Sequence, residues 1–226
     1  MFKYDMHVHC SECSACATSS SKEMVRGYKD AGYQGFVLTD HFLYGNTRVP
    51  KNIPYEEQMK MFYDAYLSAK EEGDKLDFDV LFGIEHHYGS GKELLFYGID
   101  LDFLLSNPDI PHLNPYEFSE RVREYGGFVV MAHPFRDRPY IDMSVKPIPE
   151  ILDGAEIYNA GNPEEDNIKA KVFASVHGLT MISGSDCHSV NAGNFAKGGI
   201  IVPFRIKTNE QLVSALKNGH TTPIEP

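Results

Sequence analysis

The chain has 226 residues, of which 42% are hydrophobic and 23% charged, and its formal net charge is -11. This composition is that of a globular protein and excludes a largely disordered chain. The acidic charge disfavours general binding to nucleic-acid backbones, which are themselves negative. No apolar run approaches the roughly 20 residues that span a bilayer, and the first residues lack the apolar stretch of a signal peptide. We therefore expect a cytoplasmic protein without a membrane partner.

Short apolar runs alternate with longer amphipathic segments along the whole chain. In chain order the pattern predicts a strand at Phe2–His9, a helix at Ser21–Ala31, a strand at Gly35–Thr39, a helix at Tyr55–Glu72, strands at Asp79–Glu85 and Glu93–Gly98, a helix at Asn114–Tyr125, strands at Gly127–Ala132 and Ala155–Tyr158, a helix at Glu164–His177, strands at Leu179–Ser183 and Gly199–Val202, and a helix at Asn209–Asn218. Gly32 and Gly73 are expected to end the first two helices, and Asn114-Pro115 to start the third.

The alternation of strands and helices predicts an α/β fold with a mainly parallel sheet, because parallel neighbours need crossover connections. About seven such strands can close into a barrel or stay open. No linker or repeat divides the chain, so we expect residues 1–226 to form a single domain. Two proline-containing loops, 46–54 and 137–149, are expected to shape a substrate pocket.

Side chains that can bind metals follow five of the predicted strands. The groups are His7 with His9, Asp40 with His41, Glu85 with His86 and His87, His133, and Asp186 with His188. In an α/β barrel the carboxyl ends of the strands converge on one face, where active sites lie. Several buried imidazoles and carboxylates need mutual compensation, which a divalent metal or a metal-free hydrogen-bonded network can supply. We favour the metal, and expect His112, His177 and His220 to be ordinary surface residues.

Three of the four cysteines form the pattern C-x2-C-x2-C at Cys10, Cys13 and Cys16, and Cys187 is the fourth. One interpretation is a zinc or iron–sulfur site that uses all four. The other is that small side chains fill a tight loop after the first strand in a reducing compartment. We favour the loop interpretation.

Five short motifs occur in one order along the chain. They are D-M-H-V-H at Asp5–His9, L-T-D-H at Leu38–His41, G-I-E at Gly83–Glu85, A-H-P at Ala132–Pro134 and S-G-S-D-C-H at Ser183–His188. This series resembles the PHP (polymerase and histidinol phosphatase) family over nearly the entire chain. The resemblance implies a distorted (β/α)7 barrel with two or three metal ions at the carboxyl ends of its strands, and hydrolysis of phosphate esters.

The resemblance also implies a set of metal ligands. One ion would be held by His7, His9, Glu85 and Asp186; Glu85 would bridge to a second ion that His133 also binds; and His41 and His188 would hold a third. The sequence departs from the family pattern twice. The strand at Glu93–Gly98 offers no histidine near Leu95 for the second ion, unless His87 substitutes, and Glu12 is the candidate ligand shortly after the H-x-H motif. Glu12 can equally be an exposed loop glutamate.

Histidine nitrogens combined with carboxylates suit zinc, manganese or iron better than magnesium. His188 and Arg136 are the candidate catalytic residues, and Arg136 is the candidate phosphate clamp because guanidinium binds phosphate bidentately. Asp40 is expected to orient a ligand histidine, and Asn159 is a weaker candidate for substrate contact.

We therefore expect a metal-dependent phosphatase or phosphoesterase that acts on a small phosphorylated substrate, with nucleic acid disfavoured. The alternatives are amidohydrolase-like hydrolysis of an amide and a non-catalytic metal-binding or regulatory module. The sequence does not specify an oligomeric state.

Overall fold

One sheet of nine strands runs through the molecule, and the computed structural model describes residues 1–226. The strand order is β7-β6-β5-β4-β3-β2-β1-β8-β9. The strands are β1 Phe2–Val8, β2 Gly35–Leu38, β3 Asp79–Gly89, β4 Lys92–Tyr97, β5 Phe128–Met131, β6 Gly154–Asn159, β7 Thr180–Gly184, β8 Ile200–Val202 and β9 Thr222–Pro223. The α-helices are α1 Ser21–Asp30, α2 Tyr55–Leu76, α3 Leu101–Ser106, α4 Pro115–Glu124, α5 Glu164–His177 and α6 Asn209–Lys217. Two short 3-10 helices lie at Ile110–His112 and Pro149–Ile151.

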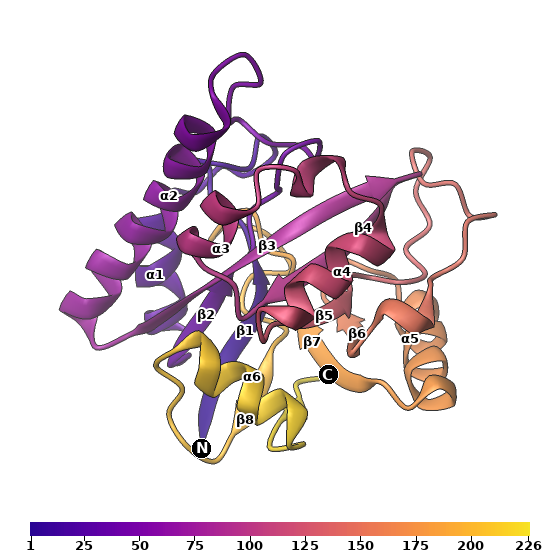
Figure 1. Cartoon of the computed structure of the whole chain (residues 1–226). Helices are drawn as coiled ribbons and strands as arrows, with labels where there is room; N and C mark the ends of the chain where they lie inside the picture. Colours follow the sequence, from indigo (N-terminus) through magenta and orange to yellow (C-terminus); the bar gives the residue numbers. More distant parts are fainter.

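The sheet curls until β1 and β7 almost meet, and helices α1 to α5 surround the strands (Figure 1). A parallel bridge joins Val8 to Cys187 just beyond β7, and the His9 amide donates to the Cys187 carbonyl at 2.9 Å. The Asp5 carboxylate strengthens this junction by accepting from the Ser185 amide at 3.0 Å. The expected α/β architecture is therefore confirmed as a nearly closed, barrel-like sheet.

The expectation of a mainly parallel sheet is wrong at two places, because β4 runs antiparallel to both β3 and β5 and β8 runs antiparallel to both β1 and β9. A two-residue turn, Ser90-Gly91, connects β3 to β4, and both residues have positive φ, 56° and 73°. Such a turn matches the twist of a β-hairpin and reverses the chain. The amino end of β4 therefore lies beside the carboxyl ends of β3 and β5.

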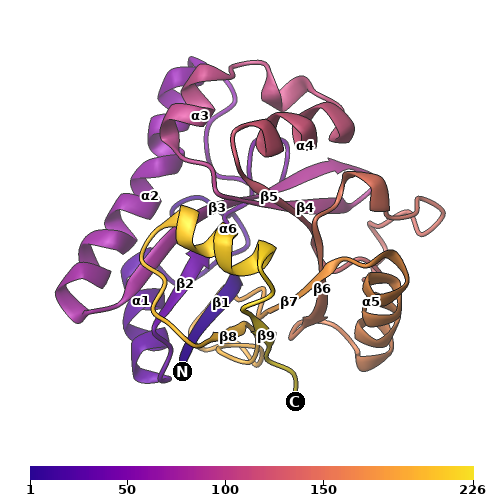
Figure 2. The same cartoon turned by 60° about the horizontal axis from the view of Figure 1, so that its bottom comes forward.

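The barrel interior is filled by apolar side chains and is covered at one end by α6. A buried cluster of 17 residues includes Met6, Leu95 and Val130 from the strands and Leu212 and Leu216 from α6. Figure 2 shows α6 lying across the end of the strands that faces the viewer. The helix seals the end of the barrel opposite to the polar side chains described below. No helix in the structure combines the length and the hydrophobicity that crossing a bilayer requires.

A β-bulge in β1 turns its last residues toward the barrel interior. Tyr4 belongs to the interior cluster, whereas Val8, four residues later, packs in the outer core. An uninterrupted strand would place both side chains on one face. The pairing of β1 with β2 shifts register between Asp5 and Val8, and bulges commonly re-aim side chains next to functional sites. The bulge thus lets His7 and His9 point inward.

Helix α2 does not end at Gly73 as predicted, but continues to Leu76 and is capped by Asp77 in a left-handed conformation. Gly73 is instead a packing position, since a Cβ there would approach the Phe78 carbonyl oxygen at 2.6 Å. Its missing side chain lets the following segment fold back against the helix. The other predicted helices lie within two residues of their observed bounds at each end, and α3 and β9 were not predicted.

Candidate metal centre

The Glu85 carboxylate lies in the middle of four imidazoles at the open end of the barrel. Its Oε1 atom is 3.0 Å from His7 Nε2 and 3.1 Å from His133 Nε2. Its Oε2 atom is 2.7 Å from His41 Nδ1 and 3.5 Å from His9 Nε2. All five residues are buried. The fold therefore brings side chains from β1, β3 and the ends of β2 and β5 into one site shielded from solvent.

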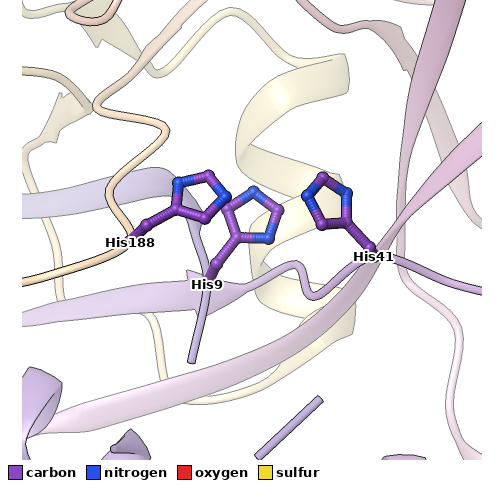
Figure 3. A group of neighbouring side chains, drawn as sticks. All are labelled: His9, His41 and His188. Carbon is purple, nitrogen blue, oxygen red and sulfur yellow. The ribbon is translucent and has the colours of Figure 1, made fainter. Parts of the chain in front are cut away.

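The segment after β7 adds Asp186 and His188 to this group. Asp186 Oδ1 is 3.3 Å from His9 Nε2 and 3.6 Å from His7 Nε2. The His188 ring stacks on His9 with a centroid distance of 4.1 Å. In Figure 3 the three imidazoles of His188, His9 and His41 lie side by side, with His9 between the other two.

Two residues of the site adopt strained backbone conformations. His133 has a φ of 28° and Asp186 a φ of 52°. Residues with a side chain seldom adopt positive φ, and such strain persists where the surrounding structure demands it, frequently at functional sites. The strain places both side chains over the open end of the barrel, toward Glu85 and His9.

Hydrogen bonds to Nδ1 orient two of the histidines. His7 Nδ1 lies 3.1 Å from Glu156 Oε1, and His188 Nδ1 lies 3.0 Å from the Asp186 carbonyl oxygen. Both partners are acceptors, so each Nδ1 carries a proton and Nε2 is the atom left to bind a metal ion in place of a second proton. Metal-binding histidines are commonly held in this way by a second group.

His9 is oriented through a serine. Its Nδ1 lies 3.1 Å from Ser14 Oγ, and the Ser14 hydroxyl donates to Asp40 Oδ1 at 2.6 Å. Because the serine proton is used toward Asp40, the His9 Nδ1 is the donor and its Nε2 lone pair is free. Asp40 itself holds no position in the cluster, and acts on His9 through Ser14 as an orienting carboxylate.

Four buried polar atoms of the site lie close to one another but make no hydrogen bond of good geometry: His7 Nε2, His9 Nε2, His41 Nδ1 and Glu85 Oε2. Leaving such atoms unpaired in a protein interior costs on the order of 1–3 kcal/mol each. The side chains of the site form four groups in which one nitrogen or oxygen atom of each residue lies within 4.8 Å of the others. The groups are His7, His9 and Glu85; His7, His133 and Asp186; His9, His41 and His188; and His41, Glu85 and Glu93. This donor set of imidazole nitrogens and carboxylate oxygens fits divalent cations.

Glu93 is a member of the cluster that the sequence did not reveal. Its Oε2 atom is 3.4 Å from His133 Nε2, and its Oε1 atom is 3.8 Å from His41 Nδ1. It therefore fills the place for which the sequence offered no histidine. The signal that would have found it is the Ser90-Gly91 turn, which makes β4 antiparallel and brings its first residues to the site.

The carboxylates of the site differ in their tendency to ionise. Burial raises the pKa of Glu85, but the charges of His7 and His41 outweigh it and hold the pKa well below its usual range. Burial likewise opposes ionisation of Asp186, yet Arg136 and His7 keep its pKa well below normal. Burial and the nearby Glu85 raise the pKa of Glu93 to about 8. An added cation would favour the ionised form of all three.

Arg136 closes one side of the site. Its Nη2 atom donates to Asp186 Oδ2 at 2.5 Å and to Asn159 Oδ1 at 2.9 Å, and its Nε atom donates to Asn162 Oδ1 at 2.7 Å. These bonds fix the guanidinium while Nη1 keeps no partner within the protein. Asn159 is buried and belongs to the same network.

A cavity of about 440 Å³ opens over the cluster. It is lined by Cys16, His41, Asn46, Glu85, Glu93, Arg136, Tyr140, Asp186 and His188. Asn46 and Tyr140 come from the two loops that were expected to shape the pocket. A larger cavity of about 880 Å³ beside α6 is lined by no histidine or cysteine, so the metal-binding side chains face the smaller one.

The structure does not bring every predicted residue into the site. The Glu12 side chain accepts from the Ser21 amide at 2.9 Å and from its hydroxyl at 2.8 Å, so it caps α1 and is not a ligand here. His87 Nε2 accepts from the Gly91 amide and supports the hairpin turn. His112, His177 and His220 are exposed as expected.

The cysteines do not form a four-thiolate site. Cys10 Sγ donates to Asp40 at 2.9 Å, Cys13 Sγ faces the Phe62 carbonyl, and Cys187 Sγ donates to the Ser189 carbonyl at 3.1 Å. Cys16 alone lines the cavity. The three buried thiols pack the loop after β1 and the segment after β7, as the loop interpretation predicted.

One family model matches part of the sequence. Residues 164–221, which include Asp186 and His188 of the site, match the family model described as PHP-associated. The match covers about a quarter of the chain and agrees with the resemblance to the PHP family that the five motifs carry. No curated protein matches the sequence.

Solved structures share the fold of this chain at low sequence identity. A two-domain protein from Bacteroides vulgatus containing a predicted PHP-like metal-dependent phosphoesterase has a TM-score of 0.72 and 16% identity, covering 98% of this chain and 64% of that one. An amidohydrolase from Chromobacterium violaceum has a TM-score of 0.63 and 14% identity over 98% of both chains. A lesion-specific endonuclease from Pyrococcus furiosus has a TM-score of 0.66 and 14% identity, covering 98% of this chain and 57% of that one. This chain thus spans about two thirds of the first structure's length and little more than half of the third's.

Proposed function

We propose that the chain is a metal-dependent phosphoesterase that acts on a small phosphate ester. The observation that carries the proposal is the orientation of the imidazoles around Glu85. The Nδ1 atoms of His7 and His9 are used by other groups, and their Nε2 atoms are buried, unpaired and directed at carboxylates. A metal-free network would have used these atoms in hydrogen bonds.

The residues suit two or three divalent ions, with zinc, manganese and iron as the candidates. His7, His9, Glu85 and Asp186 would hold one ion, and His133 with Glu85 and Glu93 a second, since the histidine nitrogens of each set lie 3.0–3.6 Å from its carboxylate oxygens. His41 and His188 remain for a third. When bound, such ions lower the pKa of a coordinated water and polarise the phosphoryl oxygens.

The charge of the site suits phosphate binding once metal ions are present. Arg136 is the one permanent cation beside the carboxylates Glu85, Glu93, Glu156 and Asp186. Protonated His7 and His41 offset part of the negative charge in the absence of metal, and divalent ions bound there would make the site more attractive to a phosphate dianion. Arg136 then adds a fixed donor, because its Nη1 atom has no other partner.

The dimensions of the cavity favour a small ester. A volume of about 440 Å³ accommodates a compound of metabolite size. The net charge of -11 acts against long polyanions. One structural relative is nevertheless a lesion-specific endonuclease, so charge alone is a weak guide and DNA belongs among the substrates tested.

The test is hydrolysis of a panel of phosphate esters by metal-loaded protein. We expect p-nitrophenyl phosphate or a sugar or nucleoside phosphate to be hydrolysed with manganese or zinc. We expect His9→Ala to lower kcat/KM by at least about 100-fold, because His9 contributes to two of the ligand groups. The matched control is His177→Ala, which removes an exposed imidazole far from the cavity.

Each alternative predicts a different result. Cleavage of duplex DNA containing a lesion, without turnover of small esters, would indicate a nuclease. Hydrolysis of dihydroorotate or a related amide would indicate an amidohydrolase. Stoichiometric metal with no turnover of any of these compounds would indicate a binding or regulatory module, and would overturn the proposal.

A further inference from the structure

The loop between β1 and α1 places one thiol beside the histidines of the cavity. Cys16 Sγ lies 3.3 Å from His41 Nε2, and it lines the cavity together with His41 and His188. The other three cysteines are buried and turned to other acceptors. Cys16 is thus distinct from them in both exposure and direction.

The loop holds this position through hydrogen bonds to both sides of the cavity. The Ala15 amide donates to the Asn46 carbonyl at 2.7 Å, and the Thr18 amide donates to the His188 carbonyl at 2.8 Å. The residues before and after Cys16 are therefore tied to the segments that follow β2 and β7. The thiol is held between His41 and His188 by the backbone.

A second observation points to a ligand at this place. The His9, His41 and His188 side chains offer nitrogens within 4.8 Å of one another, and His9 Nε2 is fully buried without a hydrogen-bond partner (Figure 3). His188 Nδ1 is occupied by the Asp186 carbonyl, so its Nε2 is available. The Nε2 atoms of His9 and His188 therefore have no protein donor, and His41 Nε2 faces the Cys16 thiol.

The distance between the thiol and the imidazole suits two ligands of one ion. Zinc binds sulfur at about 2.3 Å and nitrogen at about 2.1 Å, so tetrahedral ligands lie roughly 3.6 Å apart. The observed separation of 3.3 Å between Cys16 Sγ and His41 Nε2 requires little movement to reach this value.

We propose that Cys16 is a metal ligand, which binds as a thiolate together with His41 and His188 at the third ion of the centre. This inference rests on the proposed function, because it concerns the same metal centre. It also replaces Glu12, the candidate ligand after the H-x-H motif, with Cys16, because the Glu12 carboxylate binds the start of α1. A sulfur ligand biases this position toward zinc or iron and away from manganese and magnesium.

Cobalt substitution tests the proposal directly. Cobalt-loaded wild-type protein should show thiolate-to-cobalt charge-transfer absorption in the near ultraviolet. Cys16→Ser should lose this band, whereas Cys187→Ala should keep it, because its thiol faces the Ser189 carbonyl. Cys16→His should bind the same number of cobalt ions as wild type without the band, which separates loss of sulfur from loss of the site.

Thiol modification supplies a readout that does not depend on activity. Zinc should slow alkylation of Cys16 by iodoacetamide at least about 10-fold, measured by mass spectrometry of the modified peptide. A charge-transfer band that persists in Cys16→Ser, or alkylation at the same rate with and without zinc, would overturn the proposal. If the protein hydrolyses phosphate esters but zinc does not slow alkylation of Cys16, the proposed function holds and the Cys16 ligand is excluded. If zinc slows alkylation but no ester is hydrolysed, Cys16 is a ligand and the proposed function is wrong.

Discussion

At the scale of single residues, two adjacent histidines of β3 have unrelated roles. His86 points away from Glu85 and lies among Phe42, Phe96 and Phe118, with a ring-centroid distance of 4.8 Å to Phe118. Burial, with a smaller contribution from the charge of His87, lowers the pKa of His86 to about 3. The alternation of side chains along a strand places His86 on the face opposite to Glu85, but no residue pattern shows which aromatic rings surround it.

His86 makes the stability of the protein depend on pH. In the unfolded chain a histidine binds a proton below about pH 6.5, whereas in the folded protein it does so only near pH 3. Between these values the unfolded state holds the extra proton, so the free energy of unfolding decreases as the pH falls. The contribution is complete above pH 6.5 and is lost progressively toward pH 3.

We therefore expect His86→Phe to resist acid better than the wild type. From pH 7.5 to 5.0 the difference in unfolding free energy should change by about 2 kcal/mol in favour of the variant. Urea denaturation of metal-free protein at both pH values measures it. His177→Phe, at an exposed position, is the control and should show a constant difference; the same constant difference in His86→Phe would contradict the buried neutral imidazole.

At the scale of elements, the sequence predicted most strands and helices and one face of the site, but not the direction of β4. Apolar runs define strands well because burial selects them, and strand ends define a metal-binding face because parallel strands converge. The direction of a strand relative to its neighbour depends on the connecting turn, and the sequence pattern did not predict the tight turn at Ser90-Gly91. Glu93 and Glu156 were not predicted either, since a single carboxylate within a strand has no spacing signature.

The antiparallel β4 predicts the role of Glu93. Glu93→Gln should weaken binding of one ion at least about 10-fold and lower the measured metal content by about one ion per chain, because Glu93 contacts His133 and His41. Elemental analysis after dialysis against limiting metal measures the content. Glu93→His should restore it, whereas Glu120→Gln, at an exposed position of α4, should leave it unchanged. Full metal content in Glu93→Gln would exclude Glu93 as a ligand.

At the scale of the whole molecule, the two ends of the barrel have opposite character. One end is packed with apolar side chains beneath α6, and the other collects imidazoles and carboxylates from strands far apart in the sequence. The unpaired polar atoms at the open end oppose folding, because their desolvation is not repaid by hydrogen bonds. The sealed end supplies apolar burial that offsets this cost, so the metal-free protein should fold but with reduced stability.

Metal should therefore raise the stability of the entire protein. An ion present at about 100 times its dissociation constant stabilises the folded state by about 2.7 kcal/mol, which corresponds to roughly 5–10 °C in Tm for a chain of this size. Differential scanning fluorimetry with EDTA, zinc, manganese and cobalt measures the change. Glu85→Gln should respond much less, because Glu85 lies within reach of four imidazoles and its loss weakens each ion that it would bridge. A wild-type Tm that no divalent ion shifts would mean that the cluster is stabilised by hydrogen bonds alone, and the metal-free interpretation of the histidines would then be correct.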